Sequence, residues 1–155
     1  MKLVIVDRDG TICVEREGYI QTPDDWEPLP GALDAIARIN QAGYHVVIAA
    51  NLPGLFQQIG ERYKVDLRNI HAVGDSVRDV QAAAAAGCIP HLVLTGKGAP
   101  VQTDPLPPEF APGTRVHADL AAFATAFVAE VEAQQAAARA EADAKADRTA
   151  PAPLR

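Results

Sequence analysis

Cysteine is scarce in this sequence, and its two occurrences form no recognisable ligand or disulfide pattern. Cys13 and Cys88 lie far apart, with no CxxC pair and no Cys/His cluster around either of them. Disulfide frameworks and structural zinc sites depend on such groupings. The sequence therefore indicates neither, and we expect both thiols to be buried and reduced.

The sequence also has no long apolar run. A membrane-spanning helix needs about 18 or more consecutive apolar residues, and the first apolar run, residues 3–6, is cut off by Asp7. That run is too short for the core of a secretory signal. We therefore expect a cytoplasmic protein with no membrane partner.

Basic residues are outnumbered by acidic ones. Fourteen Lys and Arg stand against twenty Asp and Glu, which gives a formal net charge of −6. An extended nucleic-acid surface needs a basic excess, so we expect no nucleic-acid partner. Any site for a phosphate group must be built locally.

Apolar residues, by contrast, are sufficient for a core, since 48% of the 155 residues are hydrophobic. One domain of this length can therefore fold without disulfides or structural metal ions. Runs rich in β-branched residues predict strands buried on both faces. They lie at 3–6, 45–50, 69–73, 89–94 and, shorter, 113–119. Helical patterns lie at 31–43, 55–65, 77–87 and from 120 onward. This alternation predicts an α/β fold with a doubly wound parallel sheet and helices on both faces.

Two segments do not belong to this alternation. Residues 98–113 are rich in proline, and we expect them to form an extended, exposed loop. From about residue 140 the chain holds mainly alanine and charged residues, with no large apolar residue until Leu154. We predict one domain over residues 1–139, and a frayed helix and disordered tail over residues 140–155.

Acidic side chains follow two of the predicted strands at the points where they end. Asp7 and Asp9 stand in DRDGT after the first strand, and Asp75 and Asp79 stand in GDSVRD after the third. Ligands bind at the edge where parallel strands end, so we expect these acids to converge. Either motif alone is also typical of a turn or a helix N-cap, with Asp75 or Ser76 as the cap. Their occurrence together favours a functional site.

Converging carboxylates repel one another unless a hard cation neutralises them, and Mg²⁺ takes oxygen ligands of this kind. A carboxylate beside Mg²⁺ in an electropositive pocket can attack phosphorus and form an aspartyl-phosphate. A neighbouring acid can then serve the leaving group and the incoming water. The acids therefore predict a Mg²⁺-dependent site for phosphoryl transfer.

The two motifs resemble those of the haloacid dehalogenase-like (HAD) phosphohydrolases. Over residues 1–120 the chain is similar to the D-glycero-D-manno-heptose 1,7-bisphosphate 7-phosphatase family, notably in VDRDGTI, PLPGALDAIARINQAGYHVVIA and VGDSVRDVQAAAAAGC. The histidinol-phosphate phosphatases of the same subgroup are a related alternative. The resemblance implies a HAD-like fold with a minimal cap and a sugar-phosphate hydrolase of lipopolysaccharide biosynthesis that removes the 7-phosphate.

The resemblance also implies roles for individual residues. Asp7 would be the nucleophile and a Mg²⁺ ligand, and Asp75 the third protein ligand to the metal. Asp9 would be the general acid/base and would bind the metal through its backbone carbonyl. Asp79 would support these acids. Substrate contacts would come from Asn51 and from a short loop after the first strand, formed by Glu15, Arg16, Glu17, Gly18 and Tyr19.

The chain departs from the family at the end of its second strand. The family has Thr-Asn-Gln-Ser-Gly there, with a Thr hydroxyl that holds the phosphoryl group, whereas this chain has Ala50 before Asn51. A family segment with a third strand, a zinc loop and a phosphate-binding lysine is missing between residues 51 and 52, so no zinc site is expected. Lys64, the nearest following lysine, is predicted to face solvent.

These losses weaken the expected activity. Removing a preorganised donor typically costs about 10²–10³ in rate, so two such losses would cost about 10⁴–10⁶ if they add. We expect a phosphatase of reduced activity, or alternatively an impaired remnant with a binding or regulatory role. Arg8, Arg78 and Lys97 are candidates for positive charge at the mouth of the site, and equally for solvated surface charges.

The missing strand has a consequence for assembly. In the family it lies at the sheet edge beyond the second strand, so its loss would leave an apolar edge exposed. We expect a monomer, with dimerisation through this edge as the alternative. A phospho-accepting signalling receiver also carries paired acids after its first strand, but its later acceptor Asp and lysine have no clear counterpart in this sequence.

Overall fold

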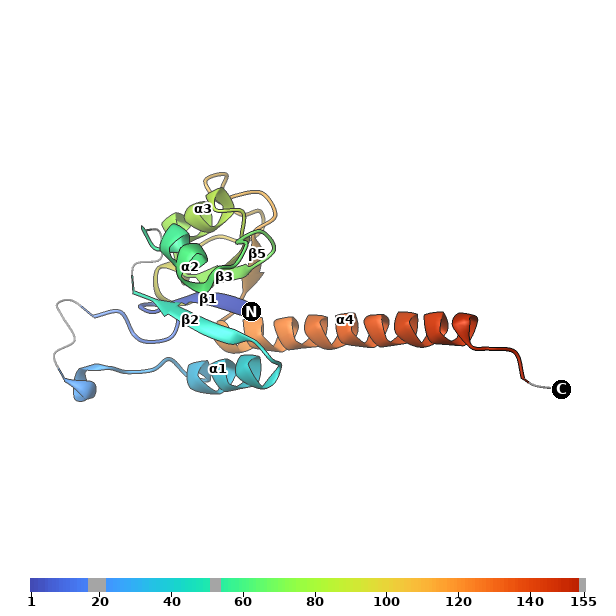
Figure 1. The fold of residues 1–155 in the computed structure, drawn as a ribbon. Helices are drawn as coiled ribbons and strands as arrows, with labels where there is room; N and C mark the ends of the chain where they lie inside the picture. Colours follow the sequence, from blue (N-terminus) through green and yellow to red (C-terminus); the bar gives the residue numbers. More distant parts are fainter. Residues whose placement is uncertain (17–21, 51–53, 154–155) are drawn as a thin grey trace.

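The computed structural model describes residues 1–16, 22–50 and 54–153. A five-stranded parallel sheet has the order β2-β1-β3-β4-β5 (Figure 1). The strands are β1 Leu3–Asp7, β2 His45–Ala49, β3 His71–Gly74, β4 Ile89–Val93 and β5 Arg115–His117. The helices are α1 Ala32–Gln41, α2 Phe56–Tyr63, α3 Val77–Ala85 and α4 Leu120–Thr149, with 3₁₀ turns η1 Pro23–Asp25 and η3 Gly96–Gly98. Every predicted strand and helix is present, with most ends within a few residues of expectation.

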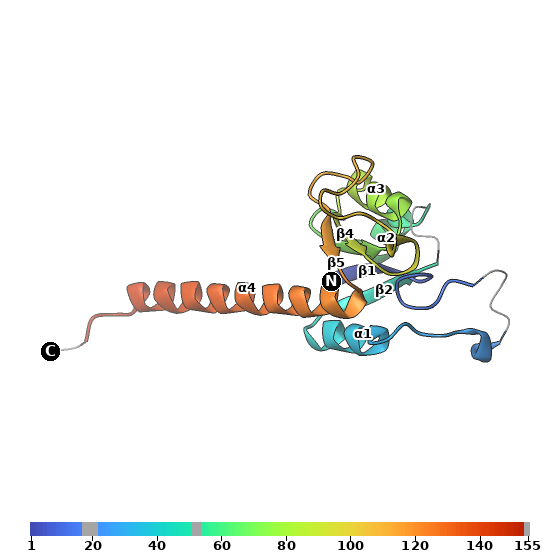
Figure 2. The ribbon, with the colours of Figure 1, turned by 180° about the vertical axis from the view of Figure 1, so that it is seen from behind.

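Helices cover both faces of the sheet, α1 and α4 on one and α2 and α3 on the other (Figures 1 and 2). All five residues of β1 are buried, which explains its continuous apolar run. Val4 and Val6 join the core beneath α1 and α4. Leu3 and Ile5 join the core beneath α2 and α3. The predicted α/β class with a doubly wound parallel sheet is confirmed.

Strand β2 lies at one edge of the sheet and pairs with β1. Its side chains are less buried than those of β1, and Ile48 is 50% exposed. An apolar edge strand of this kind can pair with another chain. The structure thus places an exposed apolar edge where the sequence predicts one, and dimerisation through it stays a prediction.

The proline-rich loop differs from its expectation. Residues 98–113 were expected to be extended and exposed, but Phe110 is 6% exposed and belongs to a small core with Val80 and Leu92. Proline spacing indicates a lack of regular structure and carries no information on packing. Val101, Leu106 and Ala111 of the loop pack against the same cluster, so apolar contacts hold the loop against α3 and β4.

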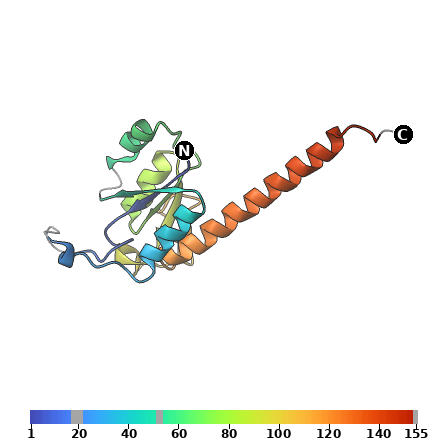
Figure 3. The same cartoon turned by 60° about the horizontal axis from the view of Figure 1, so that its bottom comes forward.

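Helix α4 continues well past the packed part of the molecule and projects into solvent (Figures 1 and 3). Its last buried residue is Val131, and residues 132–149 are exposed. The sequence predicts a frayed helix and a disordered tail from about residue 140; the structure has helix as far as Thr149, and the disorder of the tail stays a prediction. Alanine and long charged residues favour helix even without a packing partner. A segment of this composition therefore adds nothing to the hydrophobic core but can still form a continuous helix. Within the described residues, no helix is both long and apolar enough to cross a membrane.

Three histidines form a hydrogen-bonded row on the sheet face that α4 covers. His71 Nδ1 lies 2.8 Å from His91 Nε2, and His91 Nδ1 lies 2.9 Å from His117 Nε2. Phe123 and Phe127 of α4 pack edge-on against the rings. The central ring, His91, is 3% exposed. The row is therefore part of the core.

The hydrogen bonds limit how many protons the row can hold. A neutral imidazole donates from one nitrogen and accepts at the other, so each N···N contact holds one proton. A second extra proton on the row would place N–H against N–H. Burial first, and then the charges of the neighbouring His71 and His117, lowers the pKa of His91 to about 2. The charged groups near the row are Arg115 and Glu130, which pair at 3.1 Å.

We expect the free energy of unfolding to decrease as the pH falls below 6.5. His91 stays neutral in the folded protein and takes up a proton in the unfolded chain, so its contribution is present above the ordinary pKa of 6.5 and is lost below it. For His91 the loss at pH 5 is about 2 kcal/mol. Urea denaturation at pH 7.5 and pH 5.0 measures it, and the difference should shrink in His91→Leu; an equal difference in both proteins would contradict this account.

Candidate active site and metal centre

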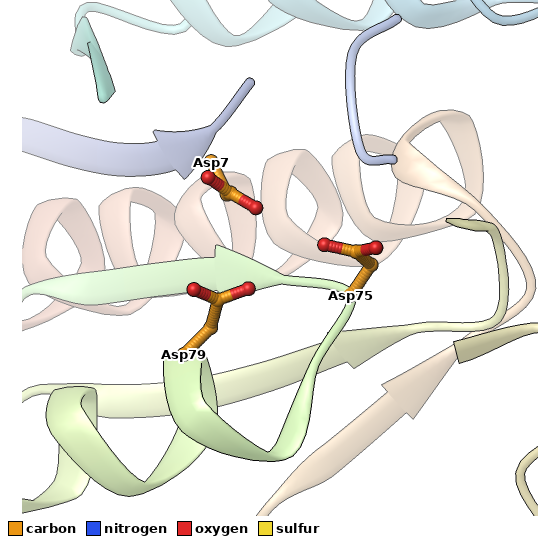
Figure 4. Close-up of side chains that lie close together, drawn as sticks. All are labelled: Asp7, Asp75 and Asp79. Atoms are coloured by element: carbon orange, nitrogen blue, oxygen red, sulfur yellow. The ribbon is translucent and has the colours of Figure 1, made fainter. Parts of the chain in front are cut away.

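Three carboxylates meet at the edge of the sheet where the strands end. Asp7 closes β1, Asp75 follows β3, and Asp79 lies in the first turn of α3. One oxygen from each lies within 4.8 Å of the others, and Figure 4 shows the three groups turned toward one another. Their exposed fractions are 7%, 2% and 5%, respectively. We call this group the Asp triad.

The cap of α3 explains why two acids are free to face Asp7. The hydroxyl of Ser76 accepts a hydrogen bond of 3.2 Å from the backbone N–H of Asp79 and so forms the N-cap. Neither Asp75 nor the Asp79 carboxylate is needed for that role. The sequence left open which of Asp75 and Ser76 caps the helix, and the structure assigns the cap to Ser76.

Two glycines permit this close packing of acids. Gly10 has φ +81°, and a Cβ on it would collide with Asp75 Oδ2. A Cβ on Gly74 would collide with the side chain of Asp79. The backbone at Gly10, and at Gly74 in β3, can therefore lie this close to the Asp triad only because these positions lack a side chain.

Without a cation, Asp7 keeps its proton at neutral pH. Burial, followed by the charge of Asp79 and the contacts of Asp75, raises the pKa of Asp7 to about 9. Burial also raises the pKa of Asp75, against the opposing hydrogen bond from the backbone of Lys97. Like charges in a buried site keep a proton on the group.

The donor set fits Mg²⁺. Hard oxygen ligands from carboxylates are what this ion prefers, and a divalent cation would replace the retained proton. In the described part of the chain, the Asp triad is the only cluster of acids, histidines or cysteines with metal-ligand spacing. Asp79, predicted only as a support, lies as near to the site as the predicted ligands Asp7 and Asp75.

Asp9 lies in the same cleft, but its side chain is bound elsewhere. Arg8 donates to both of its oxygens at 3.1 Å, and the Cys13 thiol donates to Oδ1 at 3.4 Å. Partial burial acts to raise the pKa of Asp9, but the hydrogen bonds from Arg8 and Cys13 and the Arg8 charge outweigh it and lower that pKa. Asp9 is thus ionised at neutral pH, and its predicted acid/base role stays a prediction.

A cleft of about 390 Å³ opens over these acids. Its lining includes Glu15 and also Ala50, so the position where the family has a Thr hydroxyl faces the cleft without a donor. Arg16 instead pairs with Glu27 at 3.1 Å on the surface. The other predicted substrate contacts, Glu17, Gly18, Tyr19 and Asn51, lie outside the described residues.

Among the residues that the structure describes, Arg78 and Lys97 are the basic ones that line the cleft. From the sequence, both were candidates for positive charge at the mouth of the site, and equally for solvated surface charges. Lys64 ends α2 as an exposed C-cap and does not line the cleft, as expected. Lys97 forms an ion pair with Glu15, with Nζ 3.5 Å from Oε1. No signal in the sequence indicates this pair, because it joins loops far apart in the chain.

Known proteins share both the sequence and the fold. The HAD-hydrolase-like family profile matches residues 50–123. The chain is 36% identical over 181 positions to D-glycero-beta-D-manno-heptose-1,7-bisphosphate 7-phosphatase of Bordetella bronchiseptica, covering 84% of this chain and 99% of the relative. The protein of the same name from Pseudomonas aeruginosa is 35% identical, with 81% and 97% covered.

Two solved structures are similar as well. D,D-heptose 1,7-bisphosphate phosphatase from B. bronchiseptica, complexed with magnesium and phosphate, has a TM-score of 0.72 at 35% identity and covers 84% of this chain and 99% of its own. The Burkholderia thailandensis phosphatase has a TM-score of 0.67 at 40% identity, with 83% and 99% covered.

The fold and the comparisons define a HAD-like hydrolase, related to phosphatases that cleave phosphoric monoesters. Within that class the chain belongs to the D-glycero-D-manno-heptose-1,7-bisphosphate 7-phosphatase family, as its motifs predicted.

The Bordetella alignment also indicates how much this chain is missing. Its 181 positions take in 84% of a 155-residue chain, or about 130 residues. About 50 aligned positions therefore face no residue of this chain. That number agrees with the predicted loss of an internal segment, and its location between residues 51 and 52 stays a prediction.

We expect Mg²⁺ to raise the melting temperature, and to raise it more at pH 8 than at pH 6. The Asp triad must release its retained proton to bind the cation, and this release is easier as the pH rises toward the Asp7 pKa of about 9. Thermal denaturation with and without Mg²⁺ measures the shift. It should be lost in Asp75→Asn and retained in Asp66→Asn, which changes an exposed acid outside the cleft. A shift of equal size in Asp75→Asn would rule out the Asp triad as the metal site.

Proposed function

We propose that this chain is a Mg²⁺-dependent phosphatase that removes the 7-phosphate of D-glycero-D-manno-heptose 1,7-bisphosphate. The observation that carries the proposal is the Asp triad, three buried carboxylates that open into a cleft and need a cation to ionise together. The substrate is taken from the names of the relatives. Asp7, Asp75 and Asp79 would hold Mg²⁺, which supplies charge compensation for the phosphoryl oxygens.

Asp7 is the proposed nucleophile. Its carboxylate oxygen forms a bond to phosphorus while the bond from phosphorus to the sugar oxygen breaks, and Asp9 gives that oxygen a proton. Water then attacks the phosphorus of the aspartyl-phosphate, Asp9 takes the proton of the water, and inorganic phosphate leaves with Asp7 restored. The position of both acids in one cleft supports these roles.

The ion pair between Arg8 and Asp9 affects the first step, in which Asp9 must donate a proton to the sugar oxygen. An acid that donates a proton must carry one, and Arg8 stabilises the ionised form of Asp9. The side chains of Arg8 and Asp9 are 38% and 33% exposed, so the pair can separate at little cost. Release of Arg8 when substrate enters would let Asp9 take up its proton.

A second candidate function is supported by a specific observation. Ala50 lines the cleft where the family has a hydroxyl, and the relatives have about 50 aligned positions that this chain does not have. A chain that keeps the fold and the metal but has lost turnover would bind Mg²⁺ and phosphorylated ligands in a regulatory role.

Release of inorganic phosphate from the heptose bisphosphate separates the two candidates. We expect Mg²⁺-dependent release by the parent protein and a loss of at least about 10³-fold in Asp7→Asn, because the nucleophile is removed. EDTA should abolish release by the parent. A clean, full-length parent that releases no more phosphate than Asp7→Asn would overturn the enzymatic proposal and leave the binding role.

Replacing Arg8 tests the role of Asp9. In Arg8→Gln we expect the pKa of Asp9 in the free enzyme to rise and the alkaline limb of the pH dependence of kcat/KM to move to higher pH, because kcat/KM reports the free enzyme, in which Arg8 holds Asp9 ionised. Arg68→Gln is the matched control, since Arg68 is exposed and pairs with Asp66 away from the cleft. A pH profile unchanged in Arg8→Gln would count against Asp9 as the acid.

A further inference from the structure

The loop after β4 lies directly against the Asp triad. It has the sequence Thr-Gly-Lys-Gly over residues 95–98. The backbone N–H of Lys97 donates to Asp75 Oδ2 at 2.9 Å, and the hydroxyl of Thr95 donates to the carbonyl of Gly10 at 2.6 Å. A Cβ on Gly96 would collide with Asp75 and with Gly10. The backbone that carries Lys97 is thus fixed to both halves of the site.

The side chain of Lys97 is held much less firmly than its backbone. Its Nζ lies 3.5 Å from Glu15 Oε1, and the two side chains are 66% and 45% exposed. Exposed pairs of this kind contribute little and exchange partners easily. Lysine is a compact charge on a flexible four-carbon stem. A lysine whose backbone is fixed and whose charged end can move is suited to binding an incoming anion.

The cleft needs such a charge. A phosphate group that enters it meets the Asp triad and also Asp9 and Glu15, all acidic, and Ala50 offers no hydroxyl. The basic side chains that the described residues place in its lining are those of Arg78 and Lys97. Arg78 lies in the first turn of α3 and is exposed. Lys97 donates its backbone N–H to the side chain of Asp75, a carboxylate of the Asp triad, and this hydrogen bond fixes the position of Lys97 at the cleft.

We propose that Lys97 supplies the positive charge that holds the phosphoryl group in this chain, and that it leaves Glu15 to do so. The inference rests on the proposed phosphatase function and names the residue that replaces the lost contacts. In the free protein Glu15 holds the lysine over the cleft. When phosphate binds, the lysine donates to a phosphate oxygen, and the freed Glu15 carboxylate is left at the mouth of the cleft.

Binding of inorganic phosphate to the Mg²⁺-loaded protein tests this without any need for turnover. Isothermal titration should show about 10-fold or more weaker binding in Lys97→Met, because a charge-assisted hydrogen bond to the anion is lost. Lys97→Arg should keep most of the affinity. Glu15→Gln should bind phosphate more tightly, since the lysine no longer has a competing partner. Lys64→Met changes an exposed lysine outside the cleft and should bind as the parent does.

The shift in melting temperature with Mg²⁺ separates a local effect from a damaged fold. It should be the same in Lys97→Met as in the parent, because the backbone N–H that contacts Asp75 is retained. Where turnover is measurable, kcat/KM should fall in Lys97→Met and recover in part in Lys97→Arg.

Several outcomes would overturn the inference. Phosphate affinity unchanged in Lys97→Met, or lost in Arg78→Met instead, would remove Lys97 from the role while leaving the phosphatase proposal intact. A parent protein that binds Mg²⁺ but neither binds nor releases phosphate would overturn both.

Discussion

Mutual repulsion among three buried carboxylates is the constraint on which the rest of this site depends. Asp7, Asp75 and Asp79 are brought together because β1 lies beside β3 and because Ser76, not an acid, caps α3. Burial and like charge hold the pKa of Asp7 at about 9, so the group is stable only with a proton or a cation. The same packing that would destabilise a purely structural protein thus creates a cluster of oxygen ligands that could hold a metal ion.

The balance of charge around the Asp triad decides what the cleft can do next. A metal ion would offset the negative charge of the Asp triad, but Asp9 and Glu15 would still repel an incoming phosphate. Asp9 is paired with Arg8, and Glu15 is paired with Lys97. Both pairs are partly exposed. Under the proposed function each pair separates when substrate enters, so that Asp9 can take up a proton and Lys97 can bind the phosphate group.

Much of the fold followed from local pattern. The β-branched run of residues 3–6 predicted a strand buried on both faces, and β1 is buried throughout. One feature did not follow. Phe110 packs the proline-rich loop against the core, which no local pattern reveals. Helix α4, predicted from residue 120 onward, reaches Thr149, since alanine-rich sequence favours helix even without packing contacts.

The sequence by itself determined the fold class, the family and the acids at the ends of the first and third strands, because strand pattern and motif spacing are local properties of the chain. Tertiary structure alone decided that Asp79 joins Asp7 and Asp75, that Lys97 pairs with Glu15, and that His71, His91 and His117 form a row. Each of these depends on strand register and loop packing between distant segments. Burial then sets the charge of the groups, and burial exists only in the folded chain.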